Sequence, residues 1–369
     1  MSHMNLRIPN PFKGRLLKCN RILSIVFVGL SIFAVSCDDD DNKPSGQFAD
    51  GVFVVNEGNF NSANGTVTHF SNANVTTQDL FGAVNNGRAL GDVVQSMTIY
   101  DNVGYIVVNN SKKIEVVTAS TFESLYTIDG LELPRYFTVD NGVGYVTEWV
   151  NFTDPGRVSV IDLNTHAVID QITVEGGAEN MLVDGDLLYV SNSFTETVSV
   201  IDLDAGEVIK TITVTASPSD LLKDANGKIW VVCGGQYAGN DGALVQIDPS
   251  KSNQPAEESV IRTIELGMNL GIPAKAAISP DRLDIFYITG NKVYKFNVSG
   301  TTAPANTLIS EANATNFYGI GIDRKTNVLY VADAAGFSSS GTVFRYELSG
   351  AAIDHFTAGI GPGAFAFHD

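Results

Sequence analysis

Aromatic and amide side chains recur in short polar segments of this chain, each directly after an apolar, strand-like run. Of seven such segments, five contain an aromatic residue and six contain Asn or Gln. The aromatic residues are Phe60, Trp149, Phe152, Phe194, Tyr237 and Phe337. Aromatic rings cover apolar surface, and amide groups both donate and accept hydrogen bonds. Side chains of these two kinds suit the binding of a large, uncharged and amphipathic ligand.

A second set of polar side chains lies near the expected starts of other strands. With Asn59 from the first polar segment, the further candidate ligand-binding residues are Gln95, Arg135, Tyr136, Glu179, Asn180, Lys275 and Tyr318. A simpler interpretation stays open for both sets, because loop Asn residues often serve turn geometry alone. A loop aromatic ring can likewise fold back over the core.

Carboxylates also occur in these segments, and such groups could serve catalysis. They are Glu57, Glu148, Glu179, Asp220 and Asp333. A hydrolase such as a lactonase would use acids of this kind, often together with a metal ion. The alternative is that they accept hydrogen bonds from loop amides or pair with Arg135 and Lys275.

Other signatures of an active site are missing from the sequence. His69, His166, His355 and His368 are scattered without the spacing of a zinc site. There is no G-x-S-x-G nucleophile elbow, and no acid, base and nucleophile can be named together. We therefore predict a binding protein with no catalytic residues, no metal ion and no cofactor.

The spacing of the segments indicates the fold. The sequence RVSVIDL at 157–163 is matched by TVSVIDL at 197–203, which begins 40 residues later. Each copy is followed by a polar turn and a further β-branched strand. A period of about 40 to 45 residues with several strands in each repeat is typical of a β-propeller blade.

The two ends of the chain complete this pattern. Six hairpins, with turns such as Asn141-Gly142 and Asn226-Gly227, predict six blades. The strands at 52–55 and 66–70 belong to a seventh blade without an inner strand before them, and 362–367 resembles an inner strand with nothing after it. An open ring would leave two sheet edges unpaired. The predicted fold is therefore all-β, a seven-bladed β-propeller over 48–369, with its first blade closed by strands from both termini.

A propeller would place both sets of candidate side chains together. Each inner strand starts on one face, next to the axis, and the connection between the second and third strands returns to that face. We therefore expect the candidates on one face, on loops held by rigid sheets.

Cys37 and the four aspartates at 38–41 are informative about the targeting of the chain rather than about its fold. Residues 1–36 contain five basic residues, no acidic ones and an apolar core at 22–35, which is typical of a secretory signal peptide. A small residue before a cysteine marks the cleavage site of a lipoprotein. We expect a signal peptide at 1–36, lipidation of Cys37 as a membrane anchor, and a flexible acidic tether at 37–47. An uncleaved signal anchor is the alternative.

The charge of the chain excludes one class of partner. The formal net charge is −18, and it becomes −23 once the five positive charges of 1–36 are removed. Such a surface repels nucleic acid, so we expect no nucleic-acid partner. Cys233 lies in an apolar strand, where we expect it to be a small buried residue.

Several segments resemble known families. YVTE at 145–148, LYVSN at 188–192 and YVAD at 330–333 are similar to the Y-V-T-N signature of seven-bladed surface-protein propellers, the YVTN/YncE-like family. The segments FVVNEGNF (53–60), LGDVVQSM (90–97), YIVVNNS (105–111) and LPRY (133–136) together resemble the BtuG-type lipoproteins. Cys37 with its acidic run resembles the surface-export signal of Bacteroidota lipoproteins. That signal implies the cell-surface leaflet of the outer membrane, with the inner leaflet as the alternative.

The resemblance to BtuG-type proteins implies a function. Those proteins capture cobalamin (vitamin B12) at the bacterial surface beside a TonB-dependent outer-membrane transporter. Cobalamin has a broad, mostly apolar corrin ring fringed with amides, which suits aromatic, amide and Arg side chains. Two other functions stay open: a propeller hydrolase or lactonase, and a glycan or protein adhesion module.

Overall fold

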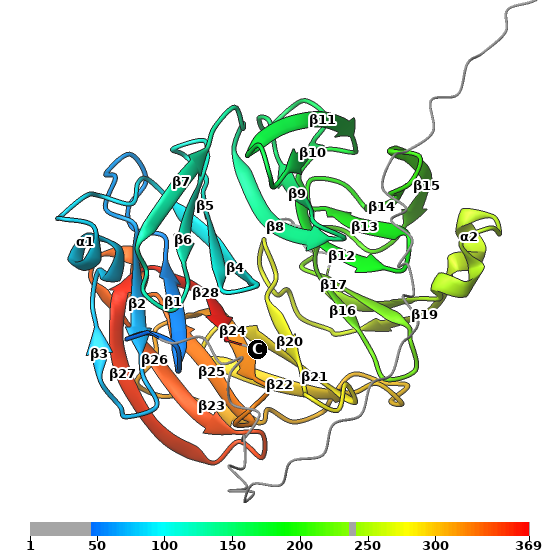
Figure 1. Cartoon of the computed structure of the whole chain (residues 1–369). Coiled ribbons are helices and arrows are strands. Elements are labelled where there is room, and N and C mark those ends of the chain that lie inside the picture. Colours follow the sequence, from blue (N-terminus) through cyan, green and yellow to red (C-terminus); the bar gives the residue numbers. More distant parts are fainter. Residues whose placement is uncertain (1–45, 236–240, 369) are drawn as a thin grey trace, which may run out of the picture. The chain divides into compact units, whose positions relative to one another are not determined.

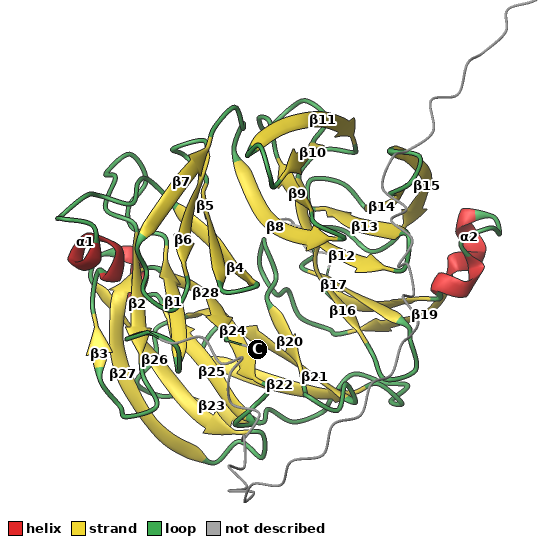
Figure 2. Ribbon diagram, viewed as in Figure 1, coloured by secondary structure: helices red, strands yellow, loops and turns green. Residues whose placement is uncertain are grey.

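The computed structural model describes residues 46–235 and 241–368. In this part of the chain, seven four-stranded antiparallel sheets surround a central axis as blades (Figure 1). Strands dominate, and the helices are short and peripheral (Figure 2). The prediction of an all-β, seven-bladed propeller is therefore confirmed. The predicted signal peptide, Cys37 and the tether up to residue 45 lie outside the described residues.

The four strands of each blade follow one another from the axis outward. Blade 1 is β28 (Pro362–Phe367), β1 (Val52–Asn56), β2 (Thr66–Phe70) and β3 (Thr76–Thr77). Blade 2 is β4 (Val94–Tyr100), β5 (Val103–Val108), β6 (Lys113–Thr118) and β7 (Ser124–Ile128). Blade 3 is β8 (Pro134–Asp140), β9 (Val143–Glu148), β10 (Arg157–Asp162) and β11 (Ala167–Thr173). Blade 4 is β12 (Ala178–Asp184), β13 (Leu187–Asn192), β14 (Thr197–Asp202) and β15 (Glu207–Thr213).

The remaining blades have the same order of strands. Blade 5 is β16 (Pro218–Lys223), β17 (Ile229–Cys233), β18 (Ala243–Ile247) and β19 (Val260–Glu265). Blade 6 is β20 (Ala276–Ile278), β21 (Asp284–Thr289), β22 (Lys292–Asn297) and β23 (Ile309–Ser310). Blade 7 is β24 (Phe317–Asp323), β25 (Val328–Asp333), β26 (Ser340–Glu347) and β27 (Ala352–Ile360).

Blade 1 closes the ring with strands from both termini, as the sequence predicts. β28 pairs antiparallel with β1, for example Val54 with Phe365 and Phe53 with Ala366. On either side β28 contacts the inner strands of its neighbours, β4 and β24. Closure leaves no sheet edge open at the point where the ring begins and ends.

The hydrophobic core is divided into layers between neighbouring blades. The layer between blades 1 and 2 contains Phe53, Phe81 and Phe122, and the layer between blades 5 and 6 contains Trp230 and Tyr287. Cys233 is a buried free thiol in β17, in agreement with the prediction. Because every blade packs on both neighbours, the sheets form a rigid base for the loops at their ends.

In the described residues, two short α-helices lie at the periphery of this ring (Figure 1). The α1 helix (Leu80–Val84) begins at Asp79, whose side chain accepts a hydrogen bond from Gly82 N, and it buries Leu80 and Phe81. The α2 helix (Ala256–Ser259) precedes β19. None of the helices in the described residues is long and apolar enough to cross a membrane.

Hydroxyl side chains in the Y-V-T-N-like segments link neighbouring blades. Thr147 Oγ1 in β9 donates to Glu179 O of the next inner strand at 2.5 Å and accepts from Tyr136 N at 3.1 Å. Ser191 in β13 makes the equivalent bonds, donating to Ser219 O at 2.5 Å and accepting from Asn180 N at 3.1 Å. These hydroxyls fix the starts of the inner strands, where the candidate residues lie.

Candidate ligand-binding face

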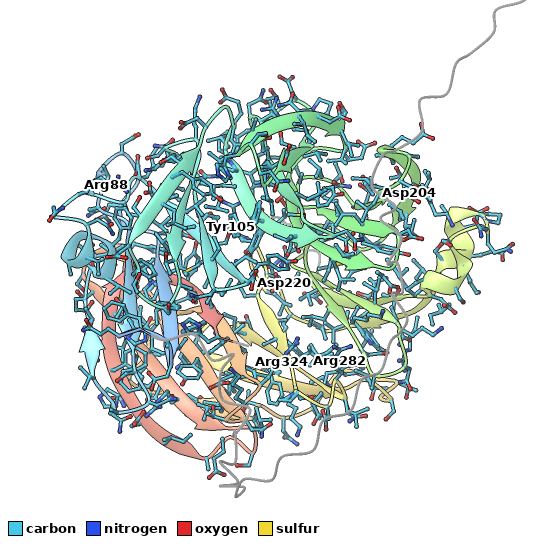
Figure 3. The ribbon with its side chains drawn as sticks, in the orientation of Figure 1. Arg88, Tyr105, Asp204, Asp220, Arg282 and Arg324 are labelled. Atoms are coloured by element: carbon cyan, nitrogen blue, oxygen red, sulfur yellow. The ribbon has the colours of Figure 1, made fainter. Side chains whose placement is uncertain are left out.

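The inner strands bring polar side chains to one end of the central axis. β4, β8, β12, β16 and β24 contribute residues near their first positions, Lys275 directly precedes β20, and Glu57 follows β1. We call this set the axial cluster; it comprises Glu57, Gln95, Arg135, Tyr136, Glu179, Asn180, Asp220, Lys275 and Tyr318. Figure 3 shows Asp220 near the centre of the ring, whereas Arg88 and Asp204 lie at its periphery.

A bidentate ion pair of the axial cluster joins blades 3 and 4. Arg135 Nε lies 2.9 Å from Glu179 Oε2 and Nη2 lies 2.7 Å from Oε1, while Nη1 donates to Gln95 Oε1. The pair is buried, with Arg135 only 5% exposed. Bidentate geometry and low exposure make such a pair stronger and more directional than a surface ion pair.

Trp149 covers this ion pair from the loop after β9. Its ring centroid lies 3.9 Å from Arg135 Cζ, a cation–π contact. Its indole Nε1 also donates to Glu179 Oε2 at 2.9 Å. Trp149 is thus held in place by two members of the axial cluster.

A second contact crosses the axis. Lys275 Nζ of blade 6 donates to the hydroxyl of Tyr136 in blade 3, and the ammonium lies 5.1 Å from the Tyr136 ring centroid. Beside it, Asp220 accepts hydrogen bonds from Asn180 Nδ2 at 2.9 Å and from Ala276 N at 2.7 Å. Because blades 3 and 6 are not neighbours, the Lys275–Tyr136 bond links two sides of the ring across its axis.

Blade 1 presents a glycine where most other blades present a polar side chain. A Cβ atom on Gly363 would lie 2.9 Å from Tyr318 Cε1 and 3.3 Å from Glu57 Oε1. That space is occupied by the ring edge of Tyr318, whose hydroxyl donates to Glu57 Oε1 at 2.8 Å. The absence of a side chain at Gly363 therefore lets blades 1 and 7 close the cluster.

Burial controls the protonation of the cluster. Desolvation raises the pKa of Glu57 and of Asp220, although hydrogen bonds and nearby cations oppose it. Burial works against the charge of Lys275, but the Tyr136 phenol and the carboxylates of Asp220 and Glu179 outweigh it and raise its pKa. The pKa of Arg135 is also raised, because Glu179 outweighs the effect of burial. The two cations thus keep their charge, and the acids gain protons more readily than free carboxyl groups.

Three aromatic rings form a patch beside the ion pair. Trp149 and Phe194 have ring centroids 4.8 Å apart, Trp149 and Phe152 5.7 Å, and Phe152 and Phe194 6.0 Å. They come from the loops between the second and third strands of blades 3 and 4. Phe152 is 70% exposed and Phe194 39%. We call these three residues the aromatic patch; it offers an apolar surface that no other described side chain covers fully.

Further aromatic residues lie on the loops of blades 7 and 1. Phe337 packs edge-on against Tyr318 with centroids 4.8 Å apart, and its carbonyl accepts from Asn59 Nδ2 at 2.6 Å. Phe60, in the same loop as Asn59, is 68% exposed. Lys275, Tyr318 and Phe337 also line a pocket of about 330 Å³ between the loops of blades 6 and 7.

The structure therefore brings most of the predicted site residues to one face. Gln95, Arg135, Tyr136, Glu179, Asn180, Lys275 and Tyr318 meet at the axis, Trp149, Phe152 and Phe194 form the aromatic patch, and Asn59, Phe60 and Phe337 lie on the loops of blades 1 and 7. Tyr237 lies outside the described residues. Sequence reasoning missed the pocket wall formed by 269–273, for which the long connection 266–275 was the available signal.

Two of the carboxylates noted in the sequence have structural partners away from the axis. Glu148 is buried and pairs with Arg157, with Nη2 2.8 Å from Oε2. Asp333 accepts hydrogen bonds from the backbone amides of Thr315, Asn316 and Ala335. Asn56 and Asn192 likewise link second to third strands, for example Asn192 Nδ2 to Ser199 Oγ at 3.0 Å. For these residues the structural interpretation holds.

The described residues contain no group of three or more His, Cys, Asp or Glu side chains arranged to hold a metal ion. The side chains on this face offer hydrogen bonding, charge and aromatic contact. The Arg135–Glu179 pair, the Lys275–Tyr136 contact and the aromatic patch can recognise a ligand that combines apolar area with polar groups.

Solved structures with the same fold include proteins from several bacteria. A quinoprotein alcohol dehydrogenase-like protein from Bacteroides thetaiotaomicron aligns with a TM-score of 0.65 and 16% identity, over 87% of this chain and 79% of that one. A functionally unknown protein from Desulfotomaculum acetoxidans aligns with a TM-score of 0.64 and 14% identity, over 86% and 98%. Hydrazine synthase of Kuenenia stuttgartiensis aligns with a TM-score of 0.59 and 16% identity, over 73% and 88%. At these identities the likeness extends to the fold alone.

No curated protein matches this sequence. A family of domains described as "Domain of unknown function (DUF5074)" matches residues 50–354. The match runs from β1 in blade 1 into β27, the outermost strand of blade 7, so it includes the axial cluster and the aromatic patch. The chain belongs to the DUF5074 family of propeller domains.

Proposed function

We propose that this protein is a surface lipoprotein that binds cobalamin, or a similar large amphipathic ligand, on the face that carries the axial cluster and the aromatic patch. In this proposal the lipid on Cys37 anchors it in the outer membrane, exposed at the cell surface. It then passes the ligand to a TonB-dependent outer-membrane transporter.

The observation that carries the proposal is that Trp149 of the aromatic patch directly contacts two residues of the axial cluster. Trp149 contacts Phe152 and Phe194 on one side and Arg135 and Glu179 on the other. An apolar ligand surface on the patch would therefore have its polar edge over the cluster. A corrin ring, which is apolar across its face and carries amides around its edge, has this distribution of groups.

The hydrogen bonds that the carboxyl groups of the axial cluster accept also favour binding over catalysis. Both oxygens of Asp220 accept hydrogen bonds, both oxygens of Glu179 are engaged by Arg135, and Glu57 is bound by Tyr318. A general base needs a carboxylate oxygen that is within reach of its substrate. A prearranged polar surface of this kind instead lowers the ordering cost of binding.

The test is whether cyanocobalamin co-elutes with the purified protein in gel filtration, followed by its visible absorbance. Trp149→Ala should weaken the association by about 1–3 kcal/mol, because Trp149 touches both halves of the proposed site. Tyr100→Ala is a matched control, because Tyr100 is an exposed aromatic residue at the opposite end of the inner strand β4.

Two results would count against the proposal. If cyanocobalamin fails to co-elute with the wild-type protein at micromolar concentration, the vitamin assignment is lost. If it binds but Trp149→Ala and Tyr100→Ala behave alike, the ligand is held elsewhere on the propeller.

A further inference from the structure

Lys275 is a buried cation with unused hydrogen-bonding capacity. An ammonium group has three donors. Within the described residues its one hydrogen-bond partner is the hydroxyl of Tyr136, and it forms no ion pair there. The residue is only 8% exposed, so bulk water contributes little to its solvation. A buried charge with unused donors is costly unless a further partner is supplied.

The acids around Lys275 are directed to other partners. Glu179 is engaged by Arg135 and Trp149, Asp220 by Asn180 and the amide of Ala276, and Glu57 by Tyr318. The carboxylates of Asp220 and Glu179 favour the charge of Lys275 without forming hydrogen bonds to its ammonium group. Donors of the Lys275 ammonium group therefore remain available for a ligand group.

Lys275 also lines the pocket of about 330 Å³ between the loops of blades 6 and 7. It is the sole charged residue among the described residues that form the lining, and no Asp or Glu is among them. This is unusual for a chain whose formal net charge is −18. Tyr318 and Phe337 supply aromatic walls next to it.

We propose that this pocket is a subsite for an oxyanion, a phosphate or carboxylate group of the ligand, and that Lys275 binds that group directly. The inference rests on the proposed function in one respect, namely that the oxyanion belongs to the ligand bound on this face. In cobalamin the group is the phosphodiester that joins the nucleotide base to the corrin ring. Phosphate binding at Lys275 would set the orientation of the ring over the aromatic patch.

Corrinoids that differ in this group provide the test. Cobinamide lacks the phosphate, sugar and base, whereas cobinamide phosphate retains the phosphate alone. Dissociation constants of cyanocobalamin, cobinamide phosphate and cobinamide are measured by calorimetry for wild type and Lys275→Met. The variant should weaken the two phosphate-bearing ligands roughly tenfold or more and change cobinamide less than about twofold, because only the phosphate contact is lost.

Two further variants test whether Lys275→Met weakens binding only by disturbing the structure. Lys275→Arg keeps the charge and should retain most of the discrimination between cobalamin and cobinamide. Lys292→Met removes an exposed cation from the same blade and face, at the start of β22, and should leave all three constants unchanged. Thermal unfolding of each variant verifies that the propeller is folded.

The possible results separate this inference from the proposed function. Equal weakening of all three ligands by Lys275→Met, or no weakening of any, overturns the oxyanion subsite while cobalamin binding stands. If the wild-type protein binds no corrinoid, the assignment of cobalamin as the ligand fails, and titrations with inorganic phosphate and with acetate decide the inference. Binding of either anion that is lost in Lys275→Met supports the subsite, and no binding of either anion to wild type overturns it.

Discussion

Charged side chains can be buried at the axis because they are paired or hydrogen-bonded to one another. Arg135 and Glu179 share two hydrogen bonds, and Trp149 binds both. Removing one partner of a buried ion pair leaves an uncompensated charge and typically costs about 3–5 kcal/mol. The side chains of the axial cluster therefore have restricted positions, since each of them is held by partners from other blades.

Glu57 makes the stability of the protein depend on pH. Burial raises its pKa above the ordinary value of 4.5, so the folded protein holds a proton that the unfolded chain releases. The contribution of Glu57 to stability is therefore present below that value and is lost as the pH rises through the raised pKa. Glu57→Gln cannot lose a proton, so the variant should gain stability relative to wild type as the pH rises from about 5 to about 8.

Urea unfolding of both proteins across this range measures the difference. Glu207→Gln serves as the control, because Glu207 is exposed on β15, and its difference from wild type should stay nearly constant. A Glu57→Gln difference that is flat with pH, or that falls as the pH rises, would show that burial does not govern this carboxyl group.

The contacts between these residues could not have been predicted from the sequence. The sequence predicts which types of residue lie at the starts of the inner strands, and that these residues share one face. However, Lys275 and Tyr136 are 139 residues apart and meet only because blades 3 and 6 face each other across the axis. The cation–π contact of Trp149 with Arg135 depends on rotamers that the repeat does not specify.

At the scale of single strands, the outermost strands of five blades share an irregularity. One residue of each is skipped in the pairing with the third strand, as in a β-bulge, and that residue is exposed and apolar: Leu125, Ile169, Ile209, Ile261 and Ile353. The residue three positions later is buried in every case. Bulges twist and interrupt a strand, and edge strands use them to avoid pairing with other molecules.

β15 offers a direct comparison between the bulged and the buried position. Ile209 is 43% exposed and Ile212 is 2% exposed. Ile209→Lys should change the free energy of unfolding by no more than about 0.5 kcal/mol, because its side chain remains in water. Ile212→Lys should cost about 3 kcal/mol or more, because it places a charge between blades 4 and 5.

Chemical denaturation of both variants provides the measurement, with gel filtration to detect association. Similar losses of stability in the two variants would mean that the exposed position is not tolerated as a bulge. The sequence showed that both isoleucines belong to a strand, but simple alternation could not reveal which one the bulge turns outward.

At the scale of the whole molecule, stability depends on the closure of blade 1. β28 supplies its inner strand and contacts β4 and β24, so it holds together the beginning and the end of the ring. Removing residues 362–369 should expose the edge of β1 and lower the unfolding temperature of the entire domain. Differential scanning calorimetry of the truncated protein measures this loss.

A peptide of residues 359–369 provides the matching control, because it can add the missing strand in trans. Partial recovery of the unfolding temperature with this peptide would attribute the loss to strand pairing. If the truncated protein resisted heat and protease as well as wild type, closure by β28 would not be needed for stability.

This level of organisation was the part most accessible from the sequence. The 40-residue offset between 157–163 and 197–203 predicts the blade repeat. The unpaired strand-like segment at 362–367 predicts the strand that closes the ring. The blade and its closure can be predicted because they depend on local patterns of strand and turn residues, and these patterns recur in several repeats. The pocket beside Lys275 was not accessible, because it is formed by irregular loops of two blades with no counterpart in the repeat.

The proposed function places the ligand on the face that carries the aromatic patch and the axial cluster. Crystals grown with cyanocobalamin test this placement most directly, because the cobalt atom gives an anomalous scattering signal that marks its position. We expect a cobalt peak above the patch and cluster, beside Trp149 and Arg135. A peak at the opposite end of the axis, near Arg324, or no ordered cobalt in crystals of a protein saturated with the vitamin, would contradict it.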